Sequence, residues 1–178
     1  MKNAYEIRGD TTVIFVTRRN GEVVEFYIDT ADLPAVSSMA NSLYAHRCAI
    51  TGRFYAKFYR RLGTNLYEKP LLHRELINPP KGYVVDHIDG NTCNNRRSNL
   101  RVVTQAENLQ NRRGAMTNSS SGIRGVFRRS DCDRWEAQVV VGRKKHRSLH
   151  KTIEEAEEAV REMRKELLPF SNEGDDAA

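Results

Sequence analysis

The sequence predicts an α+β protein. Three parts are expected: a β-hairpin-rich N-terminal segment, a strand–loop–strand–helix motif, and a small three-stranded antiparallel sheet with one amphipathic helix. Short β-branched and aromatic runs separated by turn residues recur along the chain, which is typical of antiparallel strands. Apolar residues repeat at helical spacing near the C-terminus. The 178 residues allow one ordinary domain or two small ones.

The N-terminal segment, residues 1–65, is expected to be rich in strands. Thr11–Thr17 and Glu22–Ile28 are β-branched and aromatic runs, and Asn20-Gly21 lies between them. Both turn residues tolerate a positive φ, so the pattern predicts a hairpin. Gly52–Arg60 predicts another strand, in which aromatic and basic residues interleave. A half-buried strand is the preferred interpretation of that alternation, ahead of contact with a nucleic acid.

Residues 66–113 form the second part. They predict a short helix, two strands and a second helix, at Leu71–Ile77, Tyr83–Ile88, Leu100–Val103 and from Thr104 onward. Pro79 ends the first helix, and Asp89-Gly90-Asn91 is a turn signal after the first strand. Thr104 and Glu107 have the spacing of a capping box, which marks the start of the second helix.

The C-terminal part follows a polar linker at residues 114–121. Three strands are expected within residues 122–169, at Gly122–Phe127, Arg134–Val141 and Lys144–His150. Thr152 and Glu155 form a second capping box. The apolar residues of the following helix share one face, namely Ile153, Ala156, Ala159, Val160, Met163 and Leu167. Pro169 ends this helix, and residues 170–178 are expected to be disordered.

Charge is distributed unevenly along the chain, whose net charge is +6. Residues 1–95 contain 12 Lys and Arg against 10 Asp and Glu, residues 96–147 contain 13 against 4, and residues 148–178 contain 4 against 9. A basic middle segment of this density indicates a polyanionic partner, and nucleic acid is the preferred one. The alternative is a solvated basic face without a partner.

Composition also excludes several classes. No apolar run approaches the roughly 18 residues of a membrane span, and the N-terminus does not resemble a secretory signal. Cys48, Cys93 and Cys132 are far apart and form no Cys-x-x-Cys pair, which argues against disulfides and against a zinc ribbon. We therefore expect a cytoplasmic protein with no membrane partner and no organic cofactor.

A cluster of polar residues in the second part indicates phosphodiester hydrolysis. His87 has a side chain that can accept a proton from water near neutral pH. Asp86 lies beside it on a strand, and Asn108 lies on the following helix. A carboxylate and an amide oxygen together form a hard oxygen site that suits Mg²⁺ or Mn²⁺ better than Zn²⁺.

The stretches VVDHIDGN, NNRRSNLRVVT and QAENLQN resemble the HNH nuclease family of small phage and mobile-element enzymes. The resemblance covers Leu71–Arg113 and implies that His87 is the general base, that Asp86 and Asn108 bind the metal, and that Asn99 braces the loop that holds His87. Several relatives have a histidine in place of Asn108, so the asparagine implies a weaker metal site that the DNA phosphate completes. Asp89 and Asn91 are interpreted as turn formers, and His73 as structural or phosphate-facing.

The C-terminal part resembles the ethylene-response-factor (APETALA-type) DNA-binding domain. Ile123-Arg124-Gly125-Val126, Trp135-Glu136-Ala137 and Thr152-Ile153 match it. The resemblance implies a sheet in the major groove, with DNA contacts from Arg124, Arg129 and Arg147. Four basic neighbours are expected to contact phosphate, namely Arg128, Arg134, Arg143 and Lys144. Two tryptophans that contact DNA in plant members are absent, so a different recognition sequence is expected.

Together these observations predict a metal-dependent DNA endonuclease of the homing or phage type that nicks double-stranded DNA. One site per chain favours a monomer, and a dimer is the alternative. The competing interpretation is a non-catalytic, sequence-specific DNA-binding regulator. RNA binding is disfavoured, because no stacking signature of the common RNA modules is present.

Overall fold

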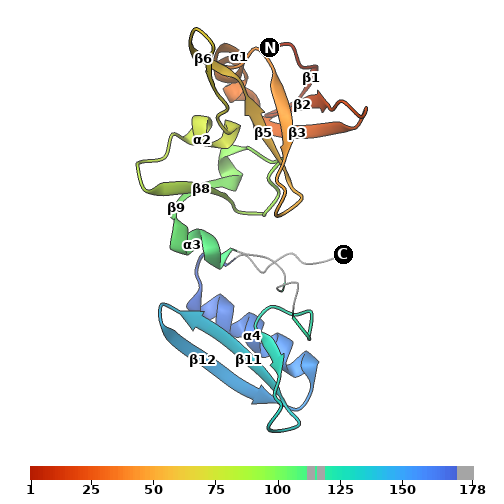
Figure 1. Ribbon diagram of the computed structural model, residues 1–178, viewed down its shortest axis with the longest axis vertical. Helices are drawn as coiled ribbons and strands as arrows, with labels where there is room; N and C mark the ends of the chain where they lie inside the picture. The colour runs from red at the N-terminus through yellow and green to blue at the C-terminus, as the bar shows by residue number, and fades with distance from the viewer. Residues whose placement is uncertain (112–114, 116–118, 172–178) are drawn as a thin grey trace. The chain divides into compact units, whose positions relative to one another are not determined.

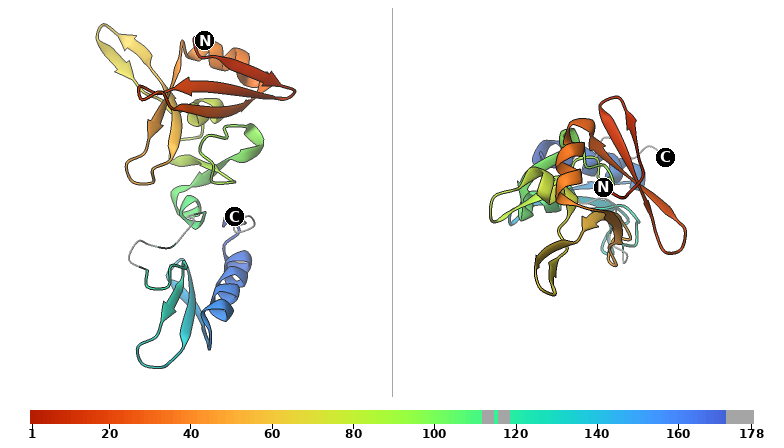
Figure 2. Two further views of the ribbon diagram at one scale, coloured as in Figure 1. Left: turned by 90° about the vertical axis from the view of Figure 1, so that its right-hand side faces the viewer. Right: turned by 90° about the horizontal axis from the view of Figure 1, so that it is seen from above.

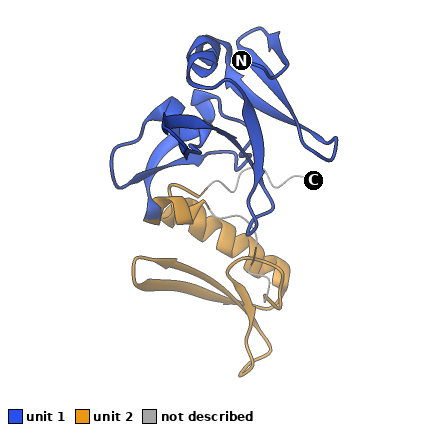
Figure 3. Ribbon diagram, turned by 45° about the horizontal axis from the view of Figure 1, so that its top comes forward, with its two compact units in different colours: residues 1–105 blue, residues 106–178 orange. Residues whose placement is uncertain are grey.

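The computed structural model describes residues 1–111, 115 and 119–171. Several small antiparallel sheets and a few helices make up the chain, which confirms the predicted α+β class (Figure 1). Two compact units are distinguished, Met1–Gln105 and Ala106–Ala178 (Figure 3). Within the described residues, no helix is long and apolar enough to cross a membrane.

A three-stranded antiparallel sheet opens the first unit. Its strands have the order β1-β2-β3 and comprise Tyr5–Arg8, Thr11–Thr17 and Val23–Asp29. The β2–β3 pairing confirms the predicted hairpin, and Gly21 in its turn has a φ of 85°. The strand β1 was not anticipated, because all four of its residues are exposed and it has no buried face for the sequence to reveal.

The rest of the first unit consists of short elements. In chain order these are a 3-10 helix (Thr30–Asp32), α1 (Leu33–Met39), β4 (Leu43–Arg47), β5 (Phe54–Phe58), β6 (Arg60–Gly63), β7 (Leu66–Glu68), α2 (Leu72–Ile77), β8 (Tyr83–His87), a second 3-10 helix (Arg97–Asn99) and β9 (Leu100–Thr104). The strands pair as β4–β5, β6–β7 and β8–β9. The helix predicted at Leu71–Ile77 and the two strands after it are confirmed.

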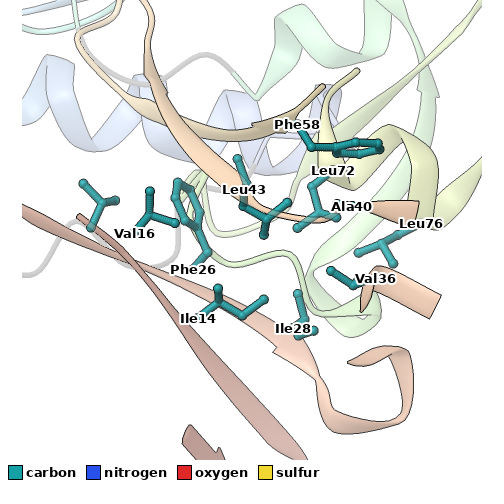
Figure 4. Packing of buried hydrophobic residues seen from close by; sticks show 12 residues of the cluster. Ile14, Val16, Phe26, Ile28, Val36, Ala40, Leu43, Phe58, Leu72 and Leu76 are labelled. Carbon is teal, nitrogen blue, oxygen red and sulfur yellow. The ribbon is translucent and has the colours of Figure 1, made fainter. Parts of the chain in front are cut away.

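The hydrophobic core of this unit joins the first sheet to the helices. Ile14 and Phe26 of the sheet are fully buried, and they share one cluster with Val36 of α1 and with Phe58 of β5 (Figure 4). Leu72 and Leu76 of α2 also belong to this cluster. Helix α2 is therefore fixed by apolar packing on the face that carries these two leucines.

The loop between β8 and β9 is held against the edge strand β3. Tyr27 donates its N–H to the carbonyl of Cys93 at 2.9 Å and accepts from the N–H of Asn95 at 2.7 Å. Two arginines of the loop also pair with carboxylates near β3: Arg96 with Asp29 at 3.0 Å, and Arg97 with Asp32 at 2.8 Å. The N-terminal segment thus supports this loop directly.

The second unit contains an antiparallel sheet with one helix along it (Figures 1 and 2). The strands β10, β11 and β12 comprise Val126–Arg128, Trp135–Val141 and Lys144–His150, and α4 comprises Ile153–Leu167. Its core contains Val126, Ala137, Val139, Ala156 and Val160, which confirms the predicted apolar face of the helix. The helix α3, Gln105–Gln110, begins in the first unit and continues into the second.

Two details of the second unit follow from local chemistry. The Thr152 hydroxyl accepts from the N–H of Glu155 at 3.2 Å, as the capping box predicts. The first strand begins at Val126 rather than at Gly122, because the φ of Gly125, 75°, is outside the range of an extended strand. Only glycine fits at this position, since a Cβ there would lie 2.6 Å from the carbonyl oxygen of Gln138. Residues 112–114 and 116–118 of the linker region and 172–178 of the tail lie outside the described residues.

Candidate active site and nucleic-acid interface

Asp86 and His87 lie at the end of β8 and are both buried, with 8% and 5% exposure. Strand pairing places Arg101 of β9 directly opposite Asp86. Its guanidinium donates from Nε and Nη2 to Oδ2 of Asp86, at 2.9 and 2.8 Å. Sequence reasoning missed Arg101, although the pairing of the two strands would have indicated it. The buried carboxylate therefore lies next to a positive charge.

The His87 imidazole contacts the amide of Asn95 and the rings of His73 and Tyr55. Its Nε2 is 3.5 Å from Oδ1 of Asn95, which is fully buried. The rings of His73 and Tyr55 have centroids 4.8 and 6.4 Å from that of His87. Burial lowers the pKa of His87, and the contact with Asn95 and the nearby carboxylates oppose this shift in part. His87 is therefore uncharged at neutral pH.

Asn99 braces the loop that follows His87. Its Oδ1 accepts from the N–H of Asp89 at 2.9 Å, and its Nδ2 donates to Oδ1 of Asp89 at 2.8 Å and to the carbonyl of Asn94 at 2.9 Å. The N–H of Ile88 also donates to the carbonyl of Asn99 at 2.8 Å. One buried side chain thus ties both ends of the loop together.

Other polar side chains shape the same loop. Asp89 accepts from the N–H of Asn91 at 2.7 Å, and Asn91 accepts from the N–H of Cys93 at 3.1 Å, so both residues form turns. Asn95 donates to the carbonyl of Cys93 at 3.0 Å and lies beside His87. Sequence reasoning did not single out Asn95, since the neighbouring asparagines gave no signal of which one is buried.

The remaining expected metal ligand, Asn108, is on α3 and belongs to the second unit, whereas Asp86, His87 and Asn99 belong to the first. Among residues 1–111, 115 and 119–171, no group of three or more His, Cys, Asp or Glu side chains could hold a metal ion. A zinc-type site built from such ligands is therefore not formed by the described residues.

Strand register assigns the basic residues of the second unit to two faces. Val139 faces the core and pairs with His146, so Lys145 and Arg147 on either side of His146 lie on the opposite, outer face. Lys144 pairs with Val141 and lies on the side of α4. Lys145 was not singled out from the sequence, although alternation along the strand would have separated it from Lys144.

The other basic candidates have different surroundings. The Arg128 guanidinium lies 5.1 Å from the centre of the Trp135 ring and pairs with Asp133. Arg129 pairs with Asp131 and, at 2.9 Å, with Glu136. Arg124 donates to the carbonyl of Gln110 at 3.2 Å, and Arg134 and Arg143 are exposed. Ion pairs within the unit therefore balance part of the local basic charge.

The outer face of the sheet also exposes apolar side chains. Phe127, Val140 and Leu149 are each nearly half exposed. Phe127 and Leu149 both pair with Glu136, and Val140 pairs with Lys145, so the three share this face. A hollow of about 370 Å³ is lined by Arg129, Glu136, Arg147, Ser148 and Leu149. Exposed apolar groups among cations are typical of a binding surface.

Comparisons with known proteins agree with the first unit's site. Residues 78–110 match the family model described as HNH endonuclease. The chain is 33% identical over 88 residues to Protein 3.8 of Escherichia phage T7, a match that covers 49% of this chain and 72% of that protein. No solved structure is significantly similar to the chain. The chain therefore belongs to one family with Protein 3.8 of Escherichia phage T7, and residues 78–110 are its HNH endonuclease segment.

Proposed function

We propose that this nuclease is a metal-dependent DNA endonuclease that nicks double-stranded DNA, with His87 as its general base. The observation that supports this best is the arrangement around β8: a buried, uncharged His87 follows Asp86 and precedes a loop braced by Asn99, all within the matched HNH segment. A rigid base next to a buried carboxylate suits the hydrolysis of a phosphodiester.

His87 would take the proton from the attacking water. Because burial lowers its pKa, the imidazole has a lone pair available at neutral pH. With a proton on Nε2, directed at Oδ1 of Asn95, the lone pair is on Nδ1. Asn95 would thereby select the reactive tautomer, and the backbone hydrogen bond from its N–H to the carbonyl of Tyr27 keeps this asparagine in place.

Asp86 and Asn108 would hold a divalent cation, Mg²⁺ or Mn²⁺. The carboxylate and amide oxygens are donors of the type these hard cations prefer. The Arg101 guanidinium bonds Oδ2 of Asp86 and thereby orients this carboxylate. When bound, such a cation neutralises charge that develops on the phosphate and the leaving oxygen. Two protein ligands leave room for water and phosphate oxygens, which Mg²⁺ usually retains.

The sheet of the second unit would supply affinity for the DNA in the manner of an ethylene-response-factor domain. Arg147 on the outer face and the exposed Arg134 and Arg143 support this role. The further candidates are Arg124, Arg128, Arg129 and Lys144. The exposed Phe127, Val140 and Leu149 lie where a groove-binding sheet contacts sugars and bases.

A supercoiled-plasmid assay tests the proposal. Plasmids with candidate target sites are incubated with the full chain in Mg²⁺, in Mn²⁺ or in EDTA. We expect conversion to open circles with either metal and none with EDTA. His87→Ala should lose this activity, by a factor of about 10² to 10⁴ for a general base, while its DNA affinity stays within a few-fold. His46→Ala, which changes an exposed histidine of β4, is the matched control.

Each other outcome has a definite meaning. A His87→Ala protein that nicks at the wild-type rate would refute the assignment of the base. Linear product without an open-circle intermediate would show that the protein cuts both strands rather than nicking one. Double-strand cleavage would favour a dimer over a monomer. Intact plasmid in all metals, together with a clear gel shift, would favour the non-catalytic DNA-binding regulator.

A further inference from the structure

His73 of α2 is a buried histidine to which the proposed reaction gives no role. It is 4% exposed, and its Nδ1 is buried without a hydrogen-bond partner. Within the described residues, one other buried side-chain atom shares this condition, Oγ of Ser171. A buried polar atom without a partner reduces stability, and a native structure that keeps one needs a reason for it.

The surroundings of His73 supply a candidate reason. Its ring centroid lies 4.8 Å from that of His87, and the two ring planes meet at 75°, which is an edge-to-face contact. Tyr55 of β5 completes the group, at 6.0 Å from His73 and 6.4 Å from His87. Two rings, from α2 and β5, therefore pack against the candidate base on β8.

The residue next to His73 in α2, Leu72, and the residue three positions later, Leu76, are anchored in the core of the unit. The position of His73 is consequently rigid. Burial, with smaller effects from His87 and Arg74, lowers the pKa of His73 to about 3. The ring is uncharged at neutral pH, so it can lie against His87 without repelling the positive charge that forms when His87 takes up a proton.

We propose that His73 is a positioning residue whose edge-to-face contact fixes the His87 imidazole in its proton-accepting orientation; this inference rests on the proposed function of His87. The contact between Nε2 of His87 and Asn95 is long, at 3.5 Å, and restrains rotation of the ring weakly. A perpendicular neighbouring ring restricts that rotation sterically, and edge-to-face pairs have a preferred geometry.

Imidazole suits this position better than an apolar side chain for two reasons. Its five-membered ring is smaller than phenyl, so it can approach His87 closely without overpacking. It is also dipolar, and an uncharged dipole held in place can stabilise the charge that develops on His87. A leucine would avoid the unpartnered nitrogen but would provide neither the ring edge nor the dipole. The unpartnered nitrogen of His73 therefore lowers the stability of the fold, while its ring keeps His87 in the orientation that the reaction needs.

The test compares His73→Leu and His73→Phe with wild type in the full chain. Single-turnover cleavage of a DNA duplex with a mapped site, thermal unfolding and DNA affinity are measured. We expect kcat to fall about 10- to 100-fold in both variants, with KM and Kd within twofold. The Tm of His73→Leu should be no lower than that of wild type, because this variant removes the unpartnered nitrogen. Val36→Ala in α1 is the matched control for lost core packing: its Tm should fall, and its kcat below the transition should match wild type.

Either variant with a wild-type kcat would overturn the proposal. So would a loss of activity in His73→Leu that merely follows a lower Tm, as expected for a structural histidine. Two-dimensional NMR of the imidazole nitrogens gives a measurement that needs no activity: His87 should show one sharp tautomer in wild type and a broadened or mixed signal in His73→Leu. An unchanged His87 signal refutes the positioning role, whereas a wild-type protein that cuts no DNA in any metal refutes the nuclease proposal.

Discussion

The candidate active site and the outer face of the second unit's sheet place their polar side chains in opposite ways. Around β8 the polar side chains of Asp86, His87, Asn95 and Asn99 are all less than 10% exposed, and each has a defined partner. Along β12, Lys145 and Arg147 are exposed. The first region is preorganised, and the second is an adaptable charged surface.

This difference implies two responses to mutation. Buried, mutually bonded groups act as a unit, so the loss of one should disturb its neighbours strongly. Exposed cations attract phosphates at longer range through water, so each should contribute a small and nearly independent amount. The predictions below test this contrast, beginning with the largest effect.

Asn99→Ala should have a large effect on both stability and cleavage. The substitution removes three side-chain hydrogen bonds and leaves the N–H of Asp89 and the carbonyl of Asn94 without this partner. We expect the free energy of unfolding to fall by about 3 kcal/mol and cleavage to be lost. Urea unfolding of the full chain measures the free energy of unfolding, and the plasmid assay measures cleavage.

The matched control for this variant is Asn91→Ala in the same loop. Asn91 is exposed, and its side chain accepts one hydrogen bond, from the N–H of Cys93. We expect a loss of only about 0.5–1 kcal/mol. Equal losses for the two variants would contradict the view that Asn99 braces the loop.

Acidification should weaken the first unit through its buried histidines. In the unfolded chain a histidine takes up a proton below its ordinary pKa of 6.5, whereas folded His73 stays neutral down to a pKa of about 3. The unfolded state therefore binds more protons between these values, so stability is complete above pH 6.5 and declines as the pH falls. The contribution of His73 is about 1.4 kcal/mol per pH unit below 6.

Urea unfolding of wild type and His73→Leu between pH 4 and 7 isolates this contribution, because the other titrating groups are common to both proteins. The wild-type stability should decline more steeply with acid than that of the variant. Parallel curves would show that His73 is protonated in the folded state, and would contradict its burial as an uncharged ring.

The sequence predicted the residues of the HNH motif better than the residues that hold them in place. Asp86, His87 and Asn99 could be recognised because VVDHIDGN and NNRRSNLRVVT resemble the HNH family and lie within a predicted strand–loop–strand–helix pattern. Arg101 was missed because the register of the two predicted strands was not worked out. Asn95 could not be recognised, because it is defined by its contact with Tyr27, which is 68 residues earlier in the chain. Partners this distant along the sequence leave no local pattern.

The fold shows the same limit. The hairpin at β2–β3 and the helix α4 were predicted, because Asn-Gly and the capping box are strong local signals. The strand β4 and the helix α1 were not anticipated. The helix α1 has seven residues and buries only Val36, so its apolar periodicity is too short to detect. Its place is determined by the core that it shares with Phe26 and Phe58.

The smallest expected effect concerns Lys145 and Lys144, which are adjacent in sequence and point to opposite faces of β12. If the outer face contacts DNA, Lys145→Ala should remove one phosphate contact and reduce the slope of log Kd against log salt by about 0.9, and Arg147→Ala should do the same. Lys144→Ala should change the slope less, because its side of the sheet faces α4. Fluorescence anisotropy at several salt concentrations measures all three. Equal slopes for both lysine variants would mean that the face of the strand does not determine contact, and that this surface attracts DNA only through its total charge.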